Sequence, residues 1–224
     1  MVRIDNVYQR VLAIANKEQR GYITPQEFNL FANHAQKEIF EQYFYELNQF
    51  LRAHGNSEEY SDIIDNIREK ISIFERTTNP VNIPFSLVNS VYRLGTVITL
   101  DGIEVQEVQS NEFLYIDKSP LLKPTVNRPV YVRQQNTCTV YPTEVNQVTY
   151  TFVKAPMRVN WGYTVTGTDA MYDPSTTMDF ELHPSEETEL VYKILLQAGV
   201  SIQRQDVAQA GMAGQKIQYQ QEKQ

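Results

Sequence analysis

Apolar residues recur every three or four positions along the N-terminal part of the chain, which is the period of an α-helix with one buried face. The first such stretch runs from Asp5 to Ala15, and we expect Asp5 to cap it. Another carries Tyr60 to Phe74 and ends before Thr77. The sequence therefore predicts two helices on either side of a longer helical stretch.

The longer stretch has the strongest start signal in the sequence. Thr24 is followed by Pro25 at the first helical position and by Glu27 three residues on, which is a capping box. Ile23 and Phe28 occupy the positions of a hydrophobic staple. Together these residues predict a helix that begins at Pro25.

The apolar stripe of this helix continues to Leu51, and Gly55 is its expected end. About 30 residues at 1.5 Å per residue give a rod of roughly 45 Å, which is long for a domain of this size. We therefore expect part of the helix to pack against a surface beyond its own core. The stripe comprises Phe28, Phe31, Ala32, Ala35, Ile39, Tyr43, Leu47, Phe50 and Leu51.

Between Pro80 and Pro174 the period changes to that of strands. Eight of the ten prolines lie in this part of the chain, between short runs rich in Val, Thr and Tyr. Asp101-Gly102 predicts a tight hairpin turn. This punctuation favours an antiparallel sandwich or small barrel over a parallel sheet. The predicted strands are 97–100, 103–105, 129–132, 137–141, 148–153 and 178–182.

Helix returns at Pro184, where acidic residues in the first turn suit the positive end of the helix dipole, and Gly199 is its expected end. Its predicted buried face is Leu190, Val191, Ile194, Leu195 and Ala198. Eight of the last 22 residues are glutamine, a composition that forms no strong apolar face. That tail is either frayed or a helix that a neighbouring subunit orders.

The predicted fold class is therefore α+β. N- and C-terminal helices form a helical bundle, with an antiparallel β-sandwich or small barrel inserted between them. The predicted parts are an N-terminal helical part (1–77), an antiparallel β unit (78–182) and C-terminal helices that pack with the N-terminal part (183–224).

The charge pattern argues against one class of function. The net charge is −7, to which residues 1–77, 78–182 and 183–224 contribute −3, −3 and −1. A protein that grips nucleic acid needs a basic patch to neutralise phosphates, and no segment here is basic. An acidic protein can still lie beside nucleic acid, but we do not expect this one to bind it tightly.

The single cysteine, Cys138, allows no intramolecular disulfide and favours a reducing compartment. It lies in a predicted strand, where a lone thiol is typically a small core residue. Arg3, Asp5 and Asn6 interrupt any signal-peptide apolar region, and no run approaches the ~18 apolar residues of a membrane span. We expect a protein made and used in solution.

Residue types with catalytic chemistry are scattered. None of the three histidines has a second His or Cys at metal-ligand spacing, and no Gly-x-Ser-x-Gly elbow occurs. The acidic pairs Glu58-Glu59 and Glu186-Glu187 stand near helix starts, and adjacent residues on one helix cannot converge across a cleft. The stretch 211–216 lacks the spacing of a phosphate loop. The histidines are His34, His54 and His183.

We therefore predict that the protein is not an enzyme, and we assign no catalytic, cofactor-binding or metal-binding residue. The one tryptophan leaves two interpretations open. Trp161 lies in a loop-like stretch between Pro156 and Tyr163, where it serves either as a core plug or as an anchor at an interface.

Three groups of motifs carry a family resemblance. The first is Arg20-Gly21-Tyr22-Ile23-Thr24-Pro25-Gln26-Glu27-Phe28-Asn29, followed by Ala35-Gln36-Lys37-Glu38-Ile39-Phe40. The second is Pro129-Val130-Tyr131, Val140-Tyr141-Pro142 and Lys154-Ala155-Pro156. The third is Phe180-Glu181-Leu182-His183-Pro184-Ser185-Glu186-Glu187, which runs into Leu190-Val191-Tyr192-Lys193-Ile194-Leu195 and Gly199-Val200. With the order of elements, they resemble the head-to-tail adaptor and tail ring proteins of podovirus-type phages, including crAss-like phages.

This resemblance implies a structural virion protein, a subunit of a ring of commonly twelve copies that joins portal and tail around the DNA channel. The implied partners are other copies of the chain, the portal protein, neighbouring tail ring proteins, and double-stranded DNA that passes through the lumen without specific binding. No membrane and no cofactor is implied. The implied location is the phage tail or neck, assembled in the host bacterial cytoplasm.

Two alternatives stay open. The chain could be another virion part, such as a tail-completion or baseplate component. It could also be a non-catalytic binding module that uses the predicted β unit as its ligand site.

Overall fold

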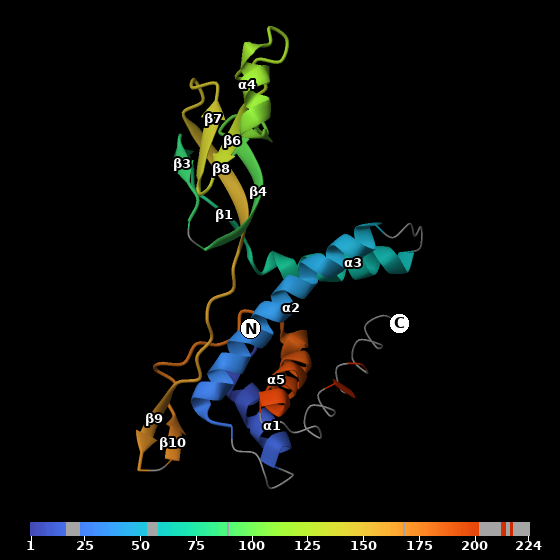
Figure 1. Cartoon of the computed structure of the whole chain (residues 1–224), viewed down its shortest axis with the longest axis vertical. Helices are drawn as coiled ribbons and strands as arrows, with labels where there is room; N and C mark the ends of the chain where they lie inside the picture. Colours follow the sequence, from blue (N-terminus) through green and yellow to red (C-terminus); the bar gives the residue numbers. More distant parts are fainter. Residues whose placement is uncertain are drawn as a thin grey trace. The chain divides into compact units, whose positions relative to one another are not determined.

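The computed structural model describes residues 1–16, 23–52, 58–88, 90–167, 169–201, 212–213 and 216. The chain divides into two compact units: unit 1 is Met1–Ile73 with Pro156–Gln224, and unit 2 is Phe74–Ala155 (Figure 1). The described residues form five α-helices and several antiparallel strand pairs. The protein is therefore α+β.

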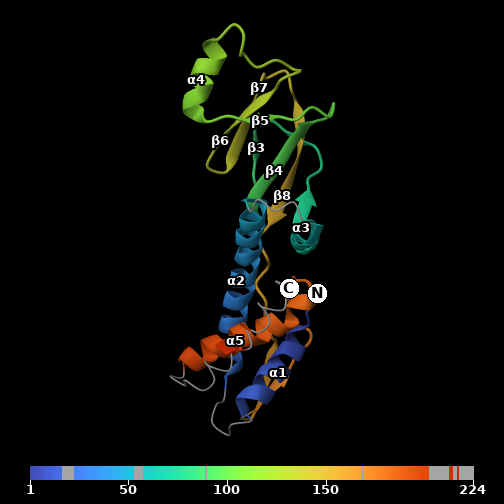
Figure 2. The same ribbon diagram turned by 90° about the vertical axis from the view of Figure 1, so that its right-hand side faces the viewer.

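Unit 1 holds four of the helices and one two-stranded hairpin. Its elements are α1 (Ile4–Asn16), α2 (Pro25–Arg52), α3 (Glu58–Ser72), β9 (Tyr163–Thr166), β10 (Asp169–Tyr172), the 3-10 turn η1 (Pro184–Glu186) and α5 (Glu187–Ser201). Figure 2 shows α5 crossing α1 and α2, the two helices that it packs against.

The predicted capping box at the start of α2 is confirmed. The Thr24 backbone N–H donates to the Glu27 Oε2 (3.0 Å), and the Glu27 backbone N–H donates to the Thr24 Oγ1 (3.3 Å). These bonds lower the pKa of the Glu27 carboxyl, the backbone bond most. Ile23 and Phe28 are both buried, as a staple requires.

The α2 stripe is buried only over its first turns. Phe28, Ala32, Ala35, Ile39 and Tyr43 are buried as predicted, but Phe31, Leu47 and Phe50 are half-buried and Leu51 is 56% exposed. The described helix ends at Arg52, and Gly55 lies outside the described residues. The partner surface expected for the end of α2 remains a prediction.

The start of α1 differs from the prediction. Asp5 lies inside the first turn and does not cap it. The Ile4 backbone N–H instead donates to Oδ1 of Asp179, 175 residues away (2.9 Å). Asp5 accepts the indole N–H of Trp161 (3.0 Å). Tertiary contacts have therefore replaced the local cap.

The buried face predicted for the last helix is confirmed, because all five of its residues are buried in α5. The predicted end is wrong. Gly199 lies within α5, which continues to Ser201. Most of the glutamine-rich tail lies outside the described residues.

Two asparagine side chains of α2 hold an extended segment of unit 1 against the helix. The Asn29 side chain accepts the Trp161 backbone N–H (2.7 Å) and donates to the Trp161 carbonyl (3.2 Å). The Asn33 side chain does the same for Val159, at 3.0 and 2.9 Å. Each amide satisfies both backbone groups of a residue that has no strand partner to satisfy them.

Gln36 continues this series. Its side chain donates to the Met157 carbonyl (2.7 Å) and accepts the Glu181 backbone N–H (3.3 Å). Residues three or four apart on a helix advance about 4.5–6 Å, and every second residue of an extended chain advances about 6.6 Å. The two repeats match, so α2 binds the segment 157–161 in a single register.

Trp161 is a core residue of unit 1. It is buried, and its ring lies 4.1 Å from that of Tyr8, which in turn meets Phe28 edge-on at 4.7 Å. Of the two interpretations left open for this residue, the core plug is the one observed. Gly162 follows because a Cβ there would lie 2.6 Å from the Asp173 carbonyl oxygen.

Unit 2 contains two four-stranded sheets and one helix. One sheet has β8 (Gln147–Lys154) paired with β1 (Glu75–Thr77), β2 (Val81–Asn82) and β4 (Val91–Thr99). The other has the order β3 (Phe85–Ser86), β7 (Thr137–Tyr141), β6 (Val130–Gln134), β5 (Gln106–Glu107). The helix is α4 (Ser110–Lys118).

The buried side chains of both sheets form one core. It comprises Phe85, Leu87, Val97, Val105, Tyr131, Cys138, Val140, Val145, Val148 and Tyr150. The strands predicted at 129–132, 137–141 and 148–153 correspond to β6, β7 and β8. The β5–β6 pair is parallel, so unit 2 is not wholly antiparallel as predicted, and neither sheet closes into a barrel.

The predicted hairpin turn at Asp101-Gly102 is observed. Gly102 has a φ of 83°, and the Thr99 backbone N–H donates to the Ile103 carbonyl (2.8 Å). The strand predicted at 178–182 forms only isolated bridges, Met178 with Asn160 and Phe180 with Val2. Neither α4 nor the β9–β10 hairpin was predicted.

The division of the chain also differs from the predicted boundaries. Unit 2 ends at Ala155, whereas the predicted β unit ran from 78 to 182. Residues 156–182 belong to unit 1 because their backbone is bound by α2, and because Trp161 and Asp179 contact α1. Sequence period does not reveal such contacts.

Replacing Asn33 by Ala leaves both backbone groups of the buried Val159 unsatisfied. We expect the free energy of unfolding to fall by about 2–4 kcal/mol, measured by urea denaturation and circular dichroism. Asn48→Ala, on an exposed part of the same helix, is the matched control and should change it by less than about 0.5 kcal/mol. Equal values for the two variants would contradict the role given to Asn33.

Candidate functional site

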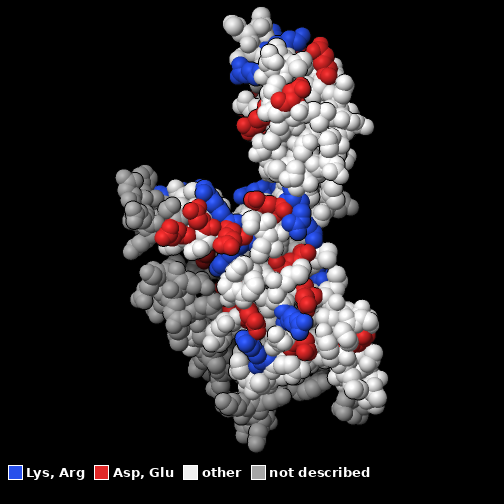
Figure 3. Space-filling view, turned by 180° about the vertical axis from the view of Figure 1, so that it is seen from behind, with Lys and Arg blue, Asp and Glu red and all other residues white. Residues whose placement is uncertain are grey.

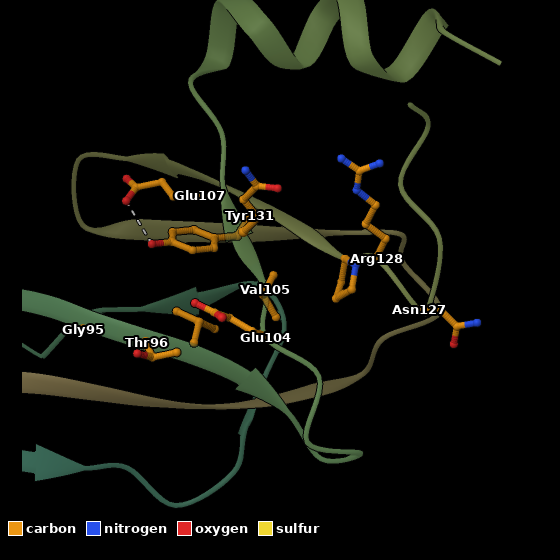
Figure 4. Close-up of a pocket in the computed structure, with 11 residues that line it drawn as sticks. Gly95, Thr96, Glu104, Val105, Glu107, Asn127, Arg128 and Tyr131 are labelled. Carbon is orange, nitrogen blue, oxygen red and sulfur yellow. Dashed lines mark hydrogen bonds between the residues drawn. The ribbon is translucent and has the colours of Figure 1, made fainter. Parts of the chain in front are cut away.

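Unit 2 contains a pocket of about 570 Å³ beside the bulged part of β4. Glu104 and Thr96 lie on one side, with Glu107 and Tyr131 across from them (Figure 4). Arg128 comes from the loop before β6. The remaining lining residues are Gly95, Val97, Val105, Gln106, Asn127 and Pro129. The pocket offers two carboxylates and one guanidinium, which suits binding of a polar group.

A hydrogen bond ties the pocket to the core of unit 2. The Tyr131 hydroxyl donates to Glu107 Oε2 at 3.0 Å. Burial, and then the negative charge of Glu107, raise the pKa of Tyr131 well above its usual range. The hydroxyl therefore stays a neutral donor at physiological pH, and it positions the Glu107 carboxylate without supplying a base.

Cys138 is a core residue, as the sequence indicated. It is fully buried on β7, and its burial raises the pKa of the thiol. A thiol that stays protonated is a poor nucleophile. Cys138 does not line the pocket.

The histidines do not come together. His34 is exposed on α2, where its Nδ1 lies 2.7 Å from Nε2 of Gln197. His183 caps η1, and its Nδ1 accepts the Ser185 backbone N–H (3.3 Å). His54 lies outside the described residues. Within the described part of the chain, no three His, Cys, Asp or Glu side chains are grouped so that they could hold a metal ion.

Of the two acidic pairs, Glu186-Glu187 has a role that sequence reasoning missed. Glu186 is 1% exposed, and its Oε1 lies 2.7 Å from the Lys70 Nζ on α3. Glu187 lies 3.1 Å from the Arg10 guanidinium on α1. The helix dipole alone did not explain them, because each pairs with a cation distant in sequence. Glu58 and Glu59 begin α3, and their side chains are outside the described set.

A second buried charge joins two helices of unit 1. Lys193 on α5 is 3% exposed, and its Nζ lies 2.7 Å from a Glu38 oxygen on α2 and 3.5 Å from a Glu189 oxygen. Pairing compensates the cost of burying the ammonium. These contacts are structural, since the Lys193–Glu38 pair joins α5 to α2 and the Lys193–Glu189 pair lies within α5.

The most unusual surface belongs to α4 and the loop that follows it, residues 110–128, which we name the α4 segment. None of the nine residues of α4 is buried. Phe113 stacks on Tyr141 with the ring centroids 4.2 Å apart, and Phe113 and Ile116 are the half-buried residues of the helix. A helix this short is marginal in water without packing. The packing of α4 on unit 2 rests on its two half-buried residues, Phe113 and Ile116.

The α4 segment also exposes large apolar side chains. Leu121 is 93% exposed and Tyr115 is 80% exposed, with Leu114, Leu122 and Val126 between 40% and 63%. Monomeric proteins expose single apolar residues commonly, but concentrations of them mark interaction sites. Five in 13 residues indicate a contact surface. The five apolar residues are visible in the sequence, but only the structure shows that they are exposed.

Figure 3 shows how charge is distributed on one face of the molecule. On the face shown in Figure 3, acidic and basic side chains are interspersed over unit 1, and much of the visible face of unit 2 carries neither. Among the described helices, none combines the length and apolar character needed to span a bilayer.

Comparison of the chain with protein-family models and with curated protein sequences found no match. The candidate sites therefore rest on geometry: the pocket lined by Glu104, Glu107 and Arg128, and the exposed apolar α4 segment.

Replacing Lys70 by Met leaves the Glu186 carboxylate buried without its cation. We expect the free energy of unfolding to fall by about 3–5 kcal/mol, and the double variant K70M/E186L to recover most of that loss. Arg68→Met breaks the exposed Asp65–Arg68 pair on the same helix and should cost less than about 1 kcal/mol. If K70M lowered the free energy of unfolding in urea by no more than R68M does, the Lys70–Glu186 pair would not stabilise the fold.

Proposed function

We propose that this protein is a structural virion protein, a subunit of an oligomeric, dodecameric ring that joins portal and tail around the DNA channel of a phage. The observation that carries the proposal is the α4 segment, whose exposed Leu114, Tyr115 and Leu121 suit contact with another protein chain. The motif resemblance supplies the identity of the assembly.

The electrostatics agree with a channel-lining or channel-adjacent role. The net charge is −7, and charges of both signs are interspersed on the surface shown in Figure 3. A cationic lumen would retain DNA, because bound phosphates release counterions. A subunit whose net charge is negative would let double-stranded DNA pass.

Two finer structural features belong to the proposal. We propose that α1, α2, α3 and α5 act as a helical bundle, and that the two sheets of unit 2 act as a sandwich. The shared core cluster of the two sheets supports the second statement.

The pocket favours a second candidate function, a non-catalytic binding module. Glu104, Glu107 and Arg128 present both signs of charge around an open hollow. A ligand with matching polar groups would bind there and would not be chemically changed. This alternative expects a monomer whose association state does not depend on the α4 segment.

The native mass of the full chain tests the ring directly. We expect a closed oligomer near twelve copies by native mass spectrometry and light scattering over a range of concentrations, alone or after addition of the portal protein. A monomer under both conditions would contradict the ring and favour the binding module.

Replacing Leu114 and Leu121 by Ser tests the α4 segment. Burial of one leucine contributes about 1.5–3 kcal/mol, so each change should weaken association about tenfold or more. The unfolding midpoint of the free subunit should not change, because both side chains are exposed. Leu100→Ser, at a 60% exposed position outside the α4 segment, is the control. Unchanged association in L114S and L121S would remove the α4 segment from the interface.

A further inference from the structure

Among the described strands, β9 and β10 form a two-stranded sheet that pairs with no other strand. Figure 1 shows it extending away from the helices of unit 1. Its strands pair only with each other, with Tyr172 opposite Tyr163 and Ala170 opposite Val165. An isolated two-stranded hairpin is marginally stable in water, since it lacks a further strand or a helix to pack on. Its root is held by Trp161, whose ring lies 6.0 Å from that of Tyr163 and 5.7 Å from that of Tyr172.

The outer edges of the hairpin carry unpaired backbone groups. The Asp173 backbone N–H donates to the Gly162 carbonyl (2.9 Å), so residues 162 and 173 form a hydrogen-bonded pair. Hydrogen-bonded and non-bonded pairs alternate in an antiparallel ladder. The Val165–Ala170 pair is three steps away and is therefore non-bonded, with its N–H and C=O groups directed outward. Within the described part of the chain, no other strand accepts them.

The hairpin carries few of the features that protect an edge. Natural edge strands are kept short, or are blocked by charged residues, proline or bulges. The hairpin, from Tyr163 to Tyr172, contains no Lys, Arg, Glu or Pro, and Asp169 is its one charged residue. Val165 is 70% exposed and Met171 58% exposed. Such an edge is a template for pairing with another strand.

We propose that the β9–β10 hairpin pairs with the hairpins of two further copies of this chain, β9 of one copy against β10 of the next. This inference rests on the proposed ring, which it deepens by naming an interface. The two edges belong to strands of equal length, four residues each. One foreign strand would satisfy only one edge, whereas a second and third copy satisfy both.

The geometry of this contact leads to a ring. Joining β9 to β10 is a heterologous contact, because the two surfaces differ, so it repeats from copy to copy until rotation closes it. Copies related by rotation present adjacent strands in opposite directions, which keeps the whole sheet antiparallel. Closure leaves no open edge, and the neighbouring strands add cross-strand side-chain neighbours to Val165 and Met171.

Proline substitution tests the pairing without disturbing the hairpin itself. Val165→Pro and Ala170→Pro each remove one outward N–H, and the preceding residues Thr164 and Asp169 already have the strand conformation that proline requires. We expect each variant to weaken assembly at least tenfold in native mass spectrometry. Val165→Thr and Ala170→Val keep the N–H and should assemble like the wild type.

Hydrogen exchange on the wild-type protein is the second measurement, and it needs no variant. The amides of Val165 and Ala170 should exchange at least tenfold more slowly in the assembled protein than in the free subunit. The amide of Thr99, bonded within unit 2, should not change.

The outcomes separate the two proposals. A wild-type oligomer that V165P and A170P still form, with unchanged exchange at both amides, would overturn the hairpin contact and leave the ring standing. A wild-type chain that stays monomeric, alone and with the portal protein, would overturn both. Unfolding midpoints of the proline variants close to that of the wild type establish that lost assembly reflects the edge.

Discussion

The fold of unit 1 depends on how the backbone N–H and C=O groups of one extended segment are hydrogen-bonded, because that segment is not part of a sheet. The extended segment 157–161 lies against α2, and a buried N–H or C=O without a partner costs about 1–3 kcal/mol. Asn29, Asn33 and Gln36 meet this requirement by bonding alternate residues of the segment. Because the bonds fix its register, they also place Trp161 in the core, and the root of the β9–β10 hairpin follows from that position.

The charged contacts of unit 1 have a related effect. Lys70 pairs with Glu186, and Lys193 pairs with Glu38, so buried ions link α3 to η1 and α5 to α2. Apolar packing alone tolerates sliding, since many apolar surfaces fit one another approximately. A buried ion tolerates little displacement, because a separated partner leaves it uncompensated. The helices are thereby held in one arrangement.

Two parts of the described surface are left without partners in different ways. The α4 segment exposes apolar side chains such as Leu121, and the β9–β10 hairpin exposes backbone groups beside Val165. Side-chain burial supplies affinity, whereas strand pairing supplies register and direction. A subunit that assembles in one orientation needs both kinds of contact, which is why we propose both surfaces as assembly contacts.

Elements with local signals could be predicted from the sequence. The capping box of Thr24 and Glu27, the buried stripe of α5 and the strands β6 to β8 follow from spacing along the chain. Features that depend on distant partners could not be predicted in this way. Asp179, and not Asp5, caps α1. Glu186, expected only to complement the helix dipole, is a buried ion paired with Lys70. Residues 157–161, expected in the β unit, belong to unit 1. This is because the spacing of apolar residues indicates which face of an element is buried, whereas a polar side chain does not indicate which distant group completes its hydrogen bonds.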